Sequence, residues 1–387
     1  MTPMTRAALI TTLAAALLGG CAADPEYLPP KLDPGPKDWP HGLHVVANHI
    51  EDSAGNTIVL RGVNRSGTEY QCVQSAGIFD GPSGDDSVAA FKNWPNVNAV
   101  RVPLNESCWL GINGVNGLAS GEYYKRAIYN YVQLLHKHDL VPILELHWVG
   151  PGSQKASRLQ PMPDADHAAA FWTDVAATFL DDDGVVLEPF NEPFPDGNKD
   201  SDAAWACWKD GCTANLYAPM VNMPIGTYQA AGMQSMVDAI RAAGSTHIVL
   251  LGGVQYSNAL TQWLAHKPAD PLNQLGAVWH VYSFNSCKTA TCWDAAPAAV
   301  AAAVPLVATE IGEDDCMGVF IAPLMQWLDA HGGGYLAWAW NTGTCVPNNH
   351  DGQPYNAWPL VSSYVTGDPA GGYAQTFRDH VAGPSAN

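Results

Sequence analysis

Two glutamates stand where apolar runs of the sequence end, in places that suit acid and nucleophile chemistry. Glu192 follows the apolar run 185–187, and two flanking prolines restrict the backbone around it. Glu310 ends a second apolar run, 305–309. A retaining glycosidase needs such a pair, because one carboxyl group must donate a proton while the other, roughly 5 Å away, attacks as a carboxylate. The pair therefore predicts hydrolysis of a glycosidic bond.

Eight strand-like apolar runs alternate with stretches of helical periodicity over most of the chain. The strands are expected at 57–64, 97–104, 141–148, 184–191, 247–253, 277–284, 305–310 and 334–341. The clearest helical stretches are 123–138, 165–180, 228–243 and 319–330. This alternation predicts an α/β protein with a (β/α)8 barrel, whose active site lies at the C-terminal ends of the strands. A turn at 54–56 is expected to pair 43–46 with 58–60 as an N-terminal hairpin.

The N-terminal segment predicts export. Residues 1–20 carry one arginine, no acid and an apolar run too short to span a membrane, which is typical of a signal peptide. The segment is similar to a bacterial lipoprotein box with Cys21 as the lipidated first residue; ordinary cleavage, with Cys21 as an odd thiol, is the alternative. Residues 21–40 are rich in proline and predict an extended tether, and 41–387 form one catalytic domain. We expect an extracellular enzyme or a lipoprotein on the outer side of a bacterial membrane.

Charge and aromatic content restrict the partners. The formal net charge of −19 disfavours nucleic acid and anionic lipid, because both would be repelled, and it leaves neutral polymers as candidates. The chain has 14 Trp and 14 Tyr, and one use for them is to stack exposed aromatic faces on sugar rings. Trp205 and Trp208 in the long connection 194–224 are expected to form an aromatic wall of the cleft, and Trp293 lies in a second walling connection.

Eight cysteines remain after Cys21, and an even number in an exported chain predicts four disulfides. Proximity in the sequence favours pairs that fasten the connections at the strand ends. A zinc site formed by the two C-x4-C pairs is the alternative, disfavoured by its wide spacing and by an oxidising compartment. The expected disulfides are Cys72–Cys108, Cys207–Cys212, Cys287–Cys292 and Cys316–Cys345.

Polar side chains stand at the ends of most of the expected strands, although unpaired polar groups within apolar strands are costly. The motifs are Arg61-Gly62-Val63-Asn64, Ala99-Val100-Arg101-Val102-Pro103, Leu146-His147-Trp148, Asn191-Glu192, Trp279-His280-Val281-Tyr282, Glu310 and Trp338-Ala339-Trp340-Asn341. Their convergence on one rim of the barrel indicates a functional site. In order and content these motifs resemble those of glycoside hydrolase family 5, the cellulase-containing family of retaining (β/α)8 enzymes. The resemblance extends from about Leu43 to Asn341.

The resemblance implies a role for each strand-end residue. It makes Glu192 the acid/base and Glu310 the nucleophile, and it puts Asn191 beside the hydroxyl group next to the reacting carbon. Arg101 and Tyr282 would hydrogen-bond the nucleophile and keep it ionised.

Three further residues would complete the site by the same resemblance. His147 and His280 would line the cleft and support the acid/base, and Trp338 would form the floor of the sugar site that is cleaved. Two features depart from the family pattern: Glu145 precedes His147 where the family often has Asp-Trp, and strand eight offers a second tryptophan. A double displacement by two carboxylates needs no metal or organic cofactor.

The substrate is the open part of this prediction. The first choice, from the frequency of activities in the family, is an endo-β-1,4-glucanase that cleaves a β-linked oligo- or polysaccharide and acts as a monomer. An exo-acting β-glycosidase and enzymes for mannan, xyloglucan or β-1,3-glucan are alternatives. A non-catalytic sugar-binding lipoprotein is a different class, which the presence of both acids disfavours. The chain lacks the G-x-S-x-G motif of serine esterases and the glycine-rich motifs of nucleotide-binding proteins.

Overall fold

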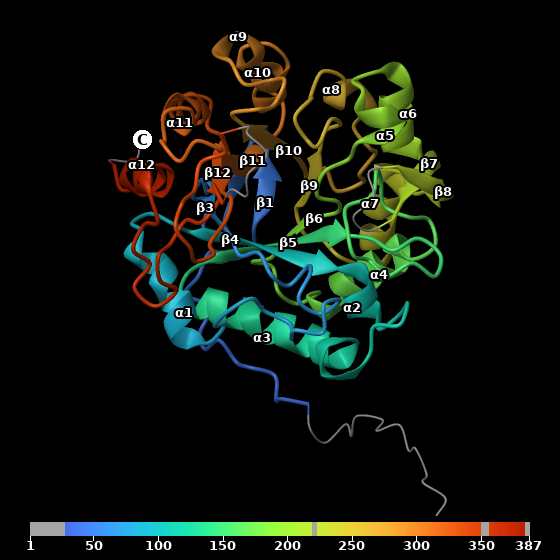
Figure 1. The fold of residues 1–387 in the computed structure, drawn as a ribbon, viewed down its shortest axis with the longest axis horizontal. Helices are drawn as coiled ribbons and strands as arrows, with labels where there is room; N and C mark the ends of the chain where they lie inside the picture. The colour runs from blue at the N-terminus through green and yellow to red at the C-terminus, as the bar shows by residue number, and fades with distance from the viewer. Residues whose placement is uncertain (1–27, 219–222, 350–355, 384–387) are drawn as a thin grey trace, which may run out of the picture.

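The computed structural model describes residues 28–218, 223–349 and 356–383. Its centre is a closed barrel of parallel strands in the order β3-β4-β5-β6-β9-β10-β11-β12, with β12 paired to β3 (Figure 1). The predicted (β/α)8 barrel is therefore confirmed. The strands are β3 Arg61–Asn64, β4 Ala99–Asn105, β5 Val141–Trp148, β6 Val186–Glu188, β9 Val249–Gly252, β10 Leu275–Tyr282, β11 Leu306–Gly312 and β12 Gly334–Ala337.

Helices surround the barrel (Figure 1). Their buried apolar side chains form one core cluster with those of the strands. In α3, for example, the buried side chains include Tyr124, Ile128, Tyr131 and Leu135, a spacing that places them on one face of a helix. The helices are α1 Asp85–Ala89, α2 Glu106–Leu110, α3 Glu122–Lys137, α4 Ala168–Thr178, α5 Pro195–Asn198, α6 Asp202–Asp210, α7 Met233–Ala242, α8 Trp263–His266, α9 Ala290–Trp293, α10 Ala296–Ala301, α11 Ile321–Ala330 and α12 Gly372–Val381, with short 3-10 turns η2 Ala90–Asn93 and η3 Gly117–Ala119.

A small N-terminal hairpin closes the end of the barrel where the strands begin. Its strands β1, His44–Val46, and β2, His49–Glu51, are antiparallel, and Ile50 belongs to the same buried cluster as Ala99 and Val141, the first residues of β4 and β5. The expected pairing of 43–46 with 58–60 was wrong, because the chain already turns at Ala47, whose φ is 53°. The opposite end of the barrel, where the strands finish, is left for the site.

The described part of the proline-rich segment lies against the barrel. The Leu32 amide donates a hydrogen bond to Asn130 Oδ1 of α3 at 2.9 Å, and Trp39, which is buried, stacks on His136. The assignment of 21–40 as a tether stays a prediction. Its first residues, together with the expected signal peptide 1–20 and Cys21, lie outside the described residues.

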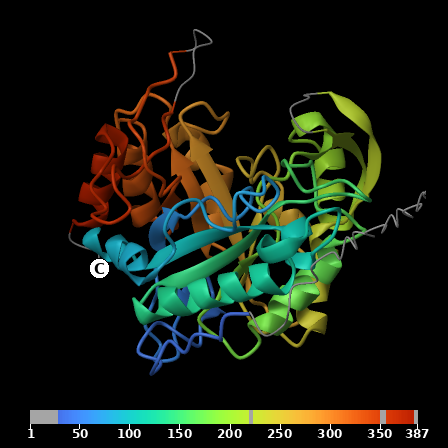
Figure 2. The ribbon, with the colours of Figure 1, turned by 60° about the horizontal axis from the view of Figure 1, so that its bottom comes forward.

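The connection after β6 carries a second hairpin, which stands out from the barrel in Figure 2. Its strands are β7, Cys212–Tyr217, and β8, Pro224–Ala230, which pair antiparallel. The expected helix at 228–243 was wrong at its start, because 228–230 belong to β8 and α7 begins only at Met233.

Four disulfides fasten the connections between the strands. None of the described helices is long and apolar enough to cross a membrane. The cysteines of both C-x4-C pairs are bonded to each other, so the alternative zinc site built from them was wrong. The disulfides are Cys72–Cys108, Cys207–Cys212, Cys287–Cys292 and Cys316–Cys345, the pairs expected from proximity.

Candidate active site

A pocket of about 370 Å³ opens at the C-terminal ends of the barrel strands. It contains the two acids found in the sequence, four of the other predicted residues and a set of aromatic side chains. Such a position is where barrel enzymes bind their substrates. The lining residues are His147, Asn191, Glu192, Tyr256, Tyr282, Phe284, Asn285, Glu310, Trp338 and Trp358.

The two acids face each other across this pocket. A carboxyl oxygen of Glu192 lies within 4.8 Å of one of Glu310. Such close carboxyl groups agree with the separation of about 5–5.5 Å in retaining glycosidases rather than with the roughly 6.5–9.5 Å of inverting ones. Glu310 is buried, whereas the Glu192 side chain is 20% exposed. Glu192 is therefore the acid that water and a leaving group can reach more easily.

The surroundings also treat the two acids differently. Burial raises the pKa of Glu192 well above its ordinary range, and the nearby charge of Glu310 raises it further. Burial raises the pKa of Glu310 too, but Arg101 and Tyr282 oppose that rise. The arrangement therefore favours a proton on Glu192 and a negative charge on Glu310.

Arg101 of β4 holds this end of the barrel together. Its guanidinium is fully buried and donates from Nη1 to Glu310 Oε1 at 2.8 Å and to Asn64 Oδ1 at 3.0 Å. Nε and Nη2 bind both oxygens of Glu188 at 2.9 and 2.6 Å, and Nη2 also donates to Asn191 Oδ1 at 2.7 Å. One side chain thus fixes the nucleophile candidate and orients the amide of Asn191.

The pKa values of this buried cluster follow from burial and charge. Burial alone would lower the pKa of Arg101, but Glu145, Glu188 and Glu310 outweigh it and raise the pKa. Burial raises the pKa of Glu188 to about 7, even though Arg101 lowers it. The guanidinium therefore stays charged beside the nucleophile candidate.

Tyr282 and His280, both of β10, each hold one of the two acids. The Tyr282 hydroxyl donates to Glu310 Oε2 at 2.6 Å. His280 Nδ1 lies 3.0 Å from Glu192 Oε1, and its Nε2 lies 3.1 Å from the Thr309 hydroxyl. Burial lowers the pKa of His280 well below its ordinary value, so the ring is neutral and can donate one hydrogen bond without adding a charge.

His147 and Trp338 occupy the other side of the pocket. Their rings stack with centroids 5.5 Å apart. His147 Nδ1 lies 2.5 Å from Glu145 Oε1, and burial lowers the pKa of His147 to about 4. Burial raises the pKa of Glu145 to about 8. Of the two histidines expected to support the acid/base, His280 contacts Glu192, whereas His147 contacts Glu145 and the rings of Trp148 and Trp338.

The structure thus brings all eight predicted site residues to one rim, but the expected aromatic wall was wrong. Trp205 and Trp208 are fully buried in α6, where they pack on each other with centroids 5.3 Å apart. Residues three positions apart lie on the same face of a helix, so the spacing of these two tryptophans was itself a sign that they share one buried face. The aromatic faces come instead from three residues of other connections, Tyr256, Phe284 and Trp358.

Two acids close to Arg101, Glu188 and Glu145, were missed as parts of the site, and Asn64 stood in a strand-end motif without an assigned role. Glu188 and Glu145 are fully buried acids in barrel strands, and Asn64 ends β3. A signal for them existed, because acids inside apolar strands require a buried cation and Arg101 is such a cation.

One oxygen or nitrogen from each of Glu192, His280 and Glu310 could meet at a metal ion, since the three atoms lie within 4.8 Å of one another. The same closeness is what a proton donor and a carboxylate nucleophile require, and His280 is already engaged with Thr309. The geometry of this group therefore also suits acid and nucleophile chemistry.

Comparisons with known proteins agree with this geometry. The family model "Cellulase (glycosyl hydrolase family 5)" matches residues 52–344. A mannan endo-1,4-beta-mannosidase from Streptomyces lividans is 25% identical over 310 residues, which cover 78% of this chain but only 66% of the length of that protein.

Solved structures share the fold. A β-glucanase from Saccharophagus degradans has a TM-score of 0.62 at 19% identity, covering 91% of this chain and 96% of that chain. A mannanase catalytic domain from Streptomyces sp. SirexAA-E has a TM-score of 0.55 at 20% identity, covering 90% and 91%. Because the family model spans most of the sequence, from just after the N-terminal hairpin to beyond the last barrel strand, this chain belongs to glycosyl hydrolase family 5.

Proposed function

We propose that this protein is a retaining glycoside hydrolase that cleaves β-1,4-linked glucan or mannan within the polymer. The observation that carries the proposal is the pair Glu192 and Glu310, with carboxyl oxygens within 4.8 Å and surroundings that favour a proton on the first and a charge on the second. That combination suits a double displacement and leaves too little room for the water of an inverting enzyme.

The reaction would proceed in two steps. Glu192 protonates the glycosidic oxygen while Glu310 attacks the anomeric carbon, so the leaving sugar departs and a glycosyl ester forms on Glu310. Once the ester has neutralised Glu310, Glu192 takes a proton from water, and the resulting attack on the anomeric carbon releases the second product and restores the free carboxylate.

The neighbours of the two acids have supporting roles in this proposal. Arg101 and Tyr282 keep the nucleophile ionised through the hydrogen bonds described above. Asn191, oriented by Arg101, binds the hydroxyl next to the reacting carbon.

The rings around the pocket complete the proposal. Neutral His280 steers Glu192 through the 3.0 Å contact. His147 and Trp338 form one stacked face of the pocket, on which the sugar ring at the cleavage point rests.

Two substrates follow from different observations. Glucan is the first choice. It is supported by the family model, which is named for cellulases, and by the similarity to the Saccharophagus degradans β-glucanase, whose structure was solved with cellotetraose. Mannan is the second, favoured by the sequence relative, which is named as an endo-acting mannosidase, and by a Streptomyces thermolilacinus β-mannanase solved with mannohexaose. These sugars differ at the carbon beside the reacting one, where Asn191 would bind.

A substrate screen with matched variants tests the function. Carboxymethyl cellulose, β-mannan, xyloglucan, laminarin and aryl β-glycosides are offered to the parent enzyme and to Glu310→Gln, which keeps the volume and removes the charge. We expect one β-1,4-linked polymer to be cleaved by the parent and none by the variant. Binding without turnover by the parent would favour a sugar-binding protein instead.

Variants of each acid assign the roles. Azide should rescue Glu310→Ala and give a product of inverted configuration, because it can enter the space of the missing nucleophile. Glu192→Ala should lose most activity on poor leaving groups and much less on activated aryl glycosides. Equal losses on both substrates would contradict the acid/base role of Glu192.

We also propose an exported enzyme that acts as a monomer, with a signal peptide at 1–20, a lipid on Cys21, a tether at 21–40 and the catalytic domain at 41–387. Four disulfides and membership of the family are consistent with an extracellular enzyme. Labelling with a radioactive fatty acid, with Cys21→Ser as control, tests the lipid.

A further inference from the structure

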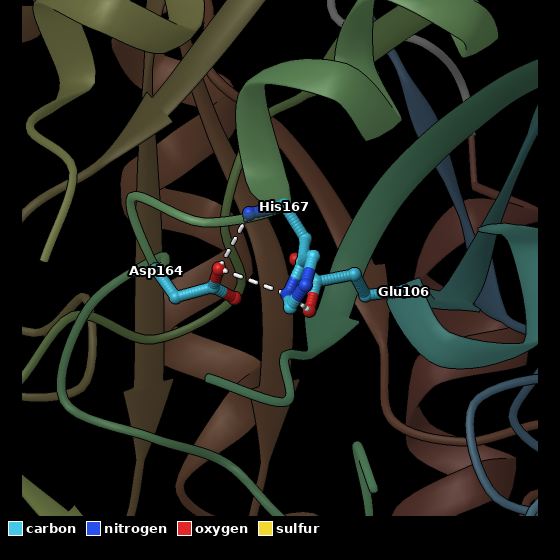
Figure 3. A group of neighbouring side chains, drawn as sticks. All are labelled: Glu106, Asp164 and His167. Carbon is cyan, nitrogen blue, oxygen red and sulfur yellow. Dashed lines mark hydrogen bonds and ion pairs between the residues drawn. The ribbon is translucent and has the colours of Figure 1, made fainter. Parts of the chain in front are cut away.

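A second group of ionisable side chains lies outside the pocket. Glu106 is the first residue of α2, directly after β4; Asp164 lies in the connection between β5 and α4; and His167 immediately precedes α4. Figure 3 shows the three side chains pointing toward one another from these separate segments. None of them lines the pocket that holds Glu192 and Glu310.

The spacing of the three side chains suits a small ion. His167 Nδ1 lies 3.4 Å from Asp164 Oδ1 and 3.9 Å from Glu106 Oε2, and one donor atom of each residue lies within 4.8 Å of the other two. Ligands placed 2.0–2.2 Å from a tetrahedral ion are about 3.4 Å from one another. The distance from His167 to Asp164 equals this spacing and the distance from His167 to Glu106 is slightly longer, so small side-chain movements would let the three residues share one ion.

Three atoms of the group lack hydrogen-bond partners within the described part of the chain: Glu106 Oε1, Asp164 Oδ2 and His167 Nδ1. Both acids are fully buried. Unsatisfied polar atoms in such a place cost free energy, and the structure must compensate for them in some way.

The negative charge of the group also needs a positive partner. Backbone amides supply part of the compensation, from Gly150 to Glu106 Oε2 at 2.8 Å and from His167 to Asp164 Oδ1 at 2.7 Å. Among the residues that the structure describes, the ion pairs of these two acids are with His167 alone. Two buried acids beside a single imidazole thus call for a proton or a cation.

We propose that Glu106, Asp164 and His167 bind one divalent transition-metal ion, and that zinc is the ion whose ligand preferences they match. Two carboxylates and an imidazole are ordinary zinc ligands, whereas calcium and magnesium prefer sites made of oxygen atoms only. The His167 side chain is 23% exposed, which gives the ion a way in and leaves a position for water.

The ion would fasten the segments that carry its ligands. Asp164 forms a β-bridge with Ala230, and the amide of Ala165 donates to the Gln229 carbonyl at 2.8 Å, so the same short segment holds the end of β8. A bound ion therefore links α2 and α4 to the base of the β7–β8 hairpin. This site does not depend on the proposed glycosidase function.

Metal binding is tested on the full chain after treatment with a chelator. The Glu310→Gln background is used, because the group of Glu192, His280 and Glu310 could take up an ion of its own. Calorimetric titration with zinc chloride should show one ion per chain. The melting temperature should rise by about 3 °C at a zinc concentration about 100 times the dissociation constant, since an ion that binds only the folded state stabilises it.

Variants of the ligands and one control identify the site. His167→Ala removes no helix cap, because this side chain makes no capping hydrogen bond, and Glu106→Gln keeps the volume of the side chain. Each of these two substitutions should weaken zinc binding by about 100-fold. Asp166→Asn is the matched control in the same segment, because its carboxylate instead accepts a hydrogen bond from the Gly152 amide at 2.8 Å. The control should bind zinc as tightly as its parent.

Cobalt gives an independent readout, because cobalt(II) in such a site absorbs visible light. The absorption should appear in the parent and in Asp166→Asn and be absent from His167→Ala. The proposal is overturned if the parent takes up no stoichiometric ion, or if the ligand variants bind as well as the parent. It is also overturned if Asp166→Asn loses as much affinity as they do, or if calcium stabilises the protein and zinc does not.

Discussion

Replacing Tyr282 by phenylalanine removes one hydrogen bond to Glu310, the proposed nucleophile, and little else. The hydroxyl donates to Glu310 Oε2 at 2.6 Å, while the ring packs on Phe284 and Trp358 and would stay in place. A hydrogen bond to a charged group contributes about 1.5–3 kcal/mol. One pKa unit corresponds to about 1.4 kcal/mol, so the pKa of Glu310 should rise by about one to two units.

The direction of the effect on activity follows from the charge. The hydrogen bond stabilises the ionised form of Glu310, so its loss raises the pKa and moves the acidic limb of the pH profile to higher pH. Well below that limb, kcat/KM should fall about 10–100-fold relative to the parent, because the ionised fraction falls by that factor. On the plateau the loss should be smaller.

The assay is kcat/KM against pH on an aryl β-glycoside with a good leaving group, for which protonation by Glu192 matters least. Tyr256→Phe is the control, because Tyr256 also lines the pocket but, among the described residues, the tyrosine that donates to Glu310 is Tyr282. Its acidic limb should coincide with that of the parent. If Tyr282→Phe lost activity equally at every pH, the argument that Tyr282 sets the ionisation of Glu310 would be refuted.

Three further predictions use the same site and its supports. Trp208→Ala should lower the free energy of unfolding by about 3–5 kcal/mol in denaturant titrations and leave the KM for polymer unchanged, because Trp208 is fully buried, whereas Trp338→Ala should raise KM. Arg101→Met should cost about 3–5 kcal/mol of stability, seen in the same titrations, and nearly all activity, since it leaves buried acids without their cation. For the parent, kcat/KM on poor leaving groups should fall as rising pH removes the proton of Glu192, at a pH above the ordinary range of a glutamate; an alkaline limb that survives in Glu192→Ala would contradict this.

The strand ends were predictable because each polar residue there interrupts an apolar run. Glu192, Glu310 and Arg101 stood out in the sequence for that reason, and the barrel followed from the alternation of strands and helices. The aromatic wall was not predictable in the same way, because the sequence does not distinguish a connection tryptophan that faces the substrate from one that faces the core. Trp205 and Trp208 turned inward with their helix.

Other errors came from contacts that no local pattern records. The first hairpin turns at Ala47, although glycine or asparagine is the residue expected at a positive φ. The turn was therefore predicted at 54–56, where the sequence contains both of these residues. Glu106, Asp164 and His167 are too far apart in the sequence to form a ligand motif, and only the packing of two connections brings them together.

The guanidinium of Arg101 also bears on how such a protein changes over generations. Because it contacts Asn64, Glu188, Asn191 and Glu310 at once, replacing any one of these four partners alone leaves the others buried beside a charge without their full set of hydrogen bonds. Descendant proteins with only one of these residues replaced would be lost before a compensating second substitution occurred. Substitutions that change substrate specificity would therefore accumulate in the connections that carry Tyr256, Phe284 and Trp358, where one residue can be replaced without a compensating second change.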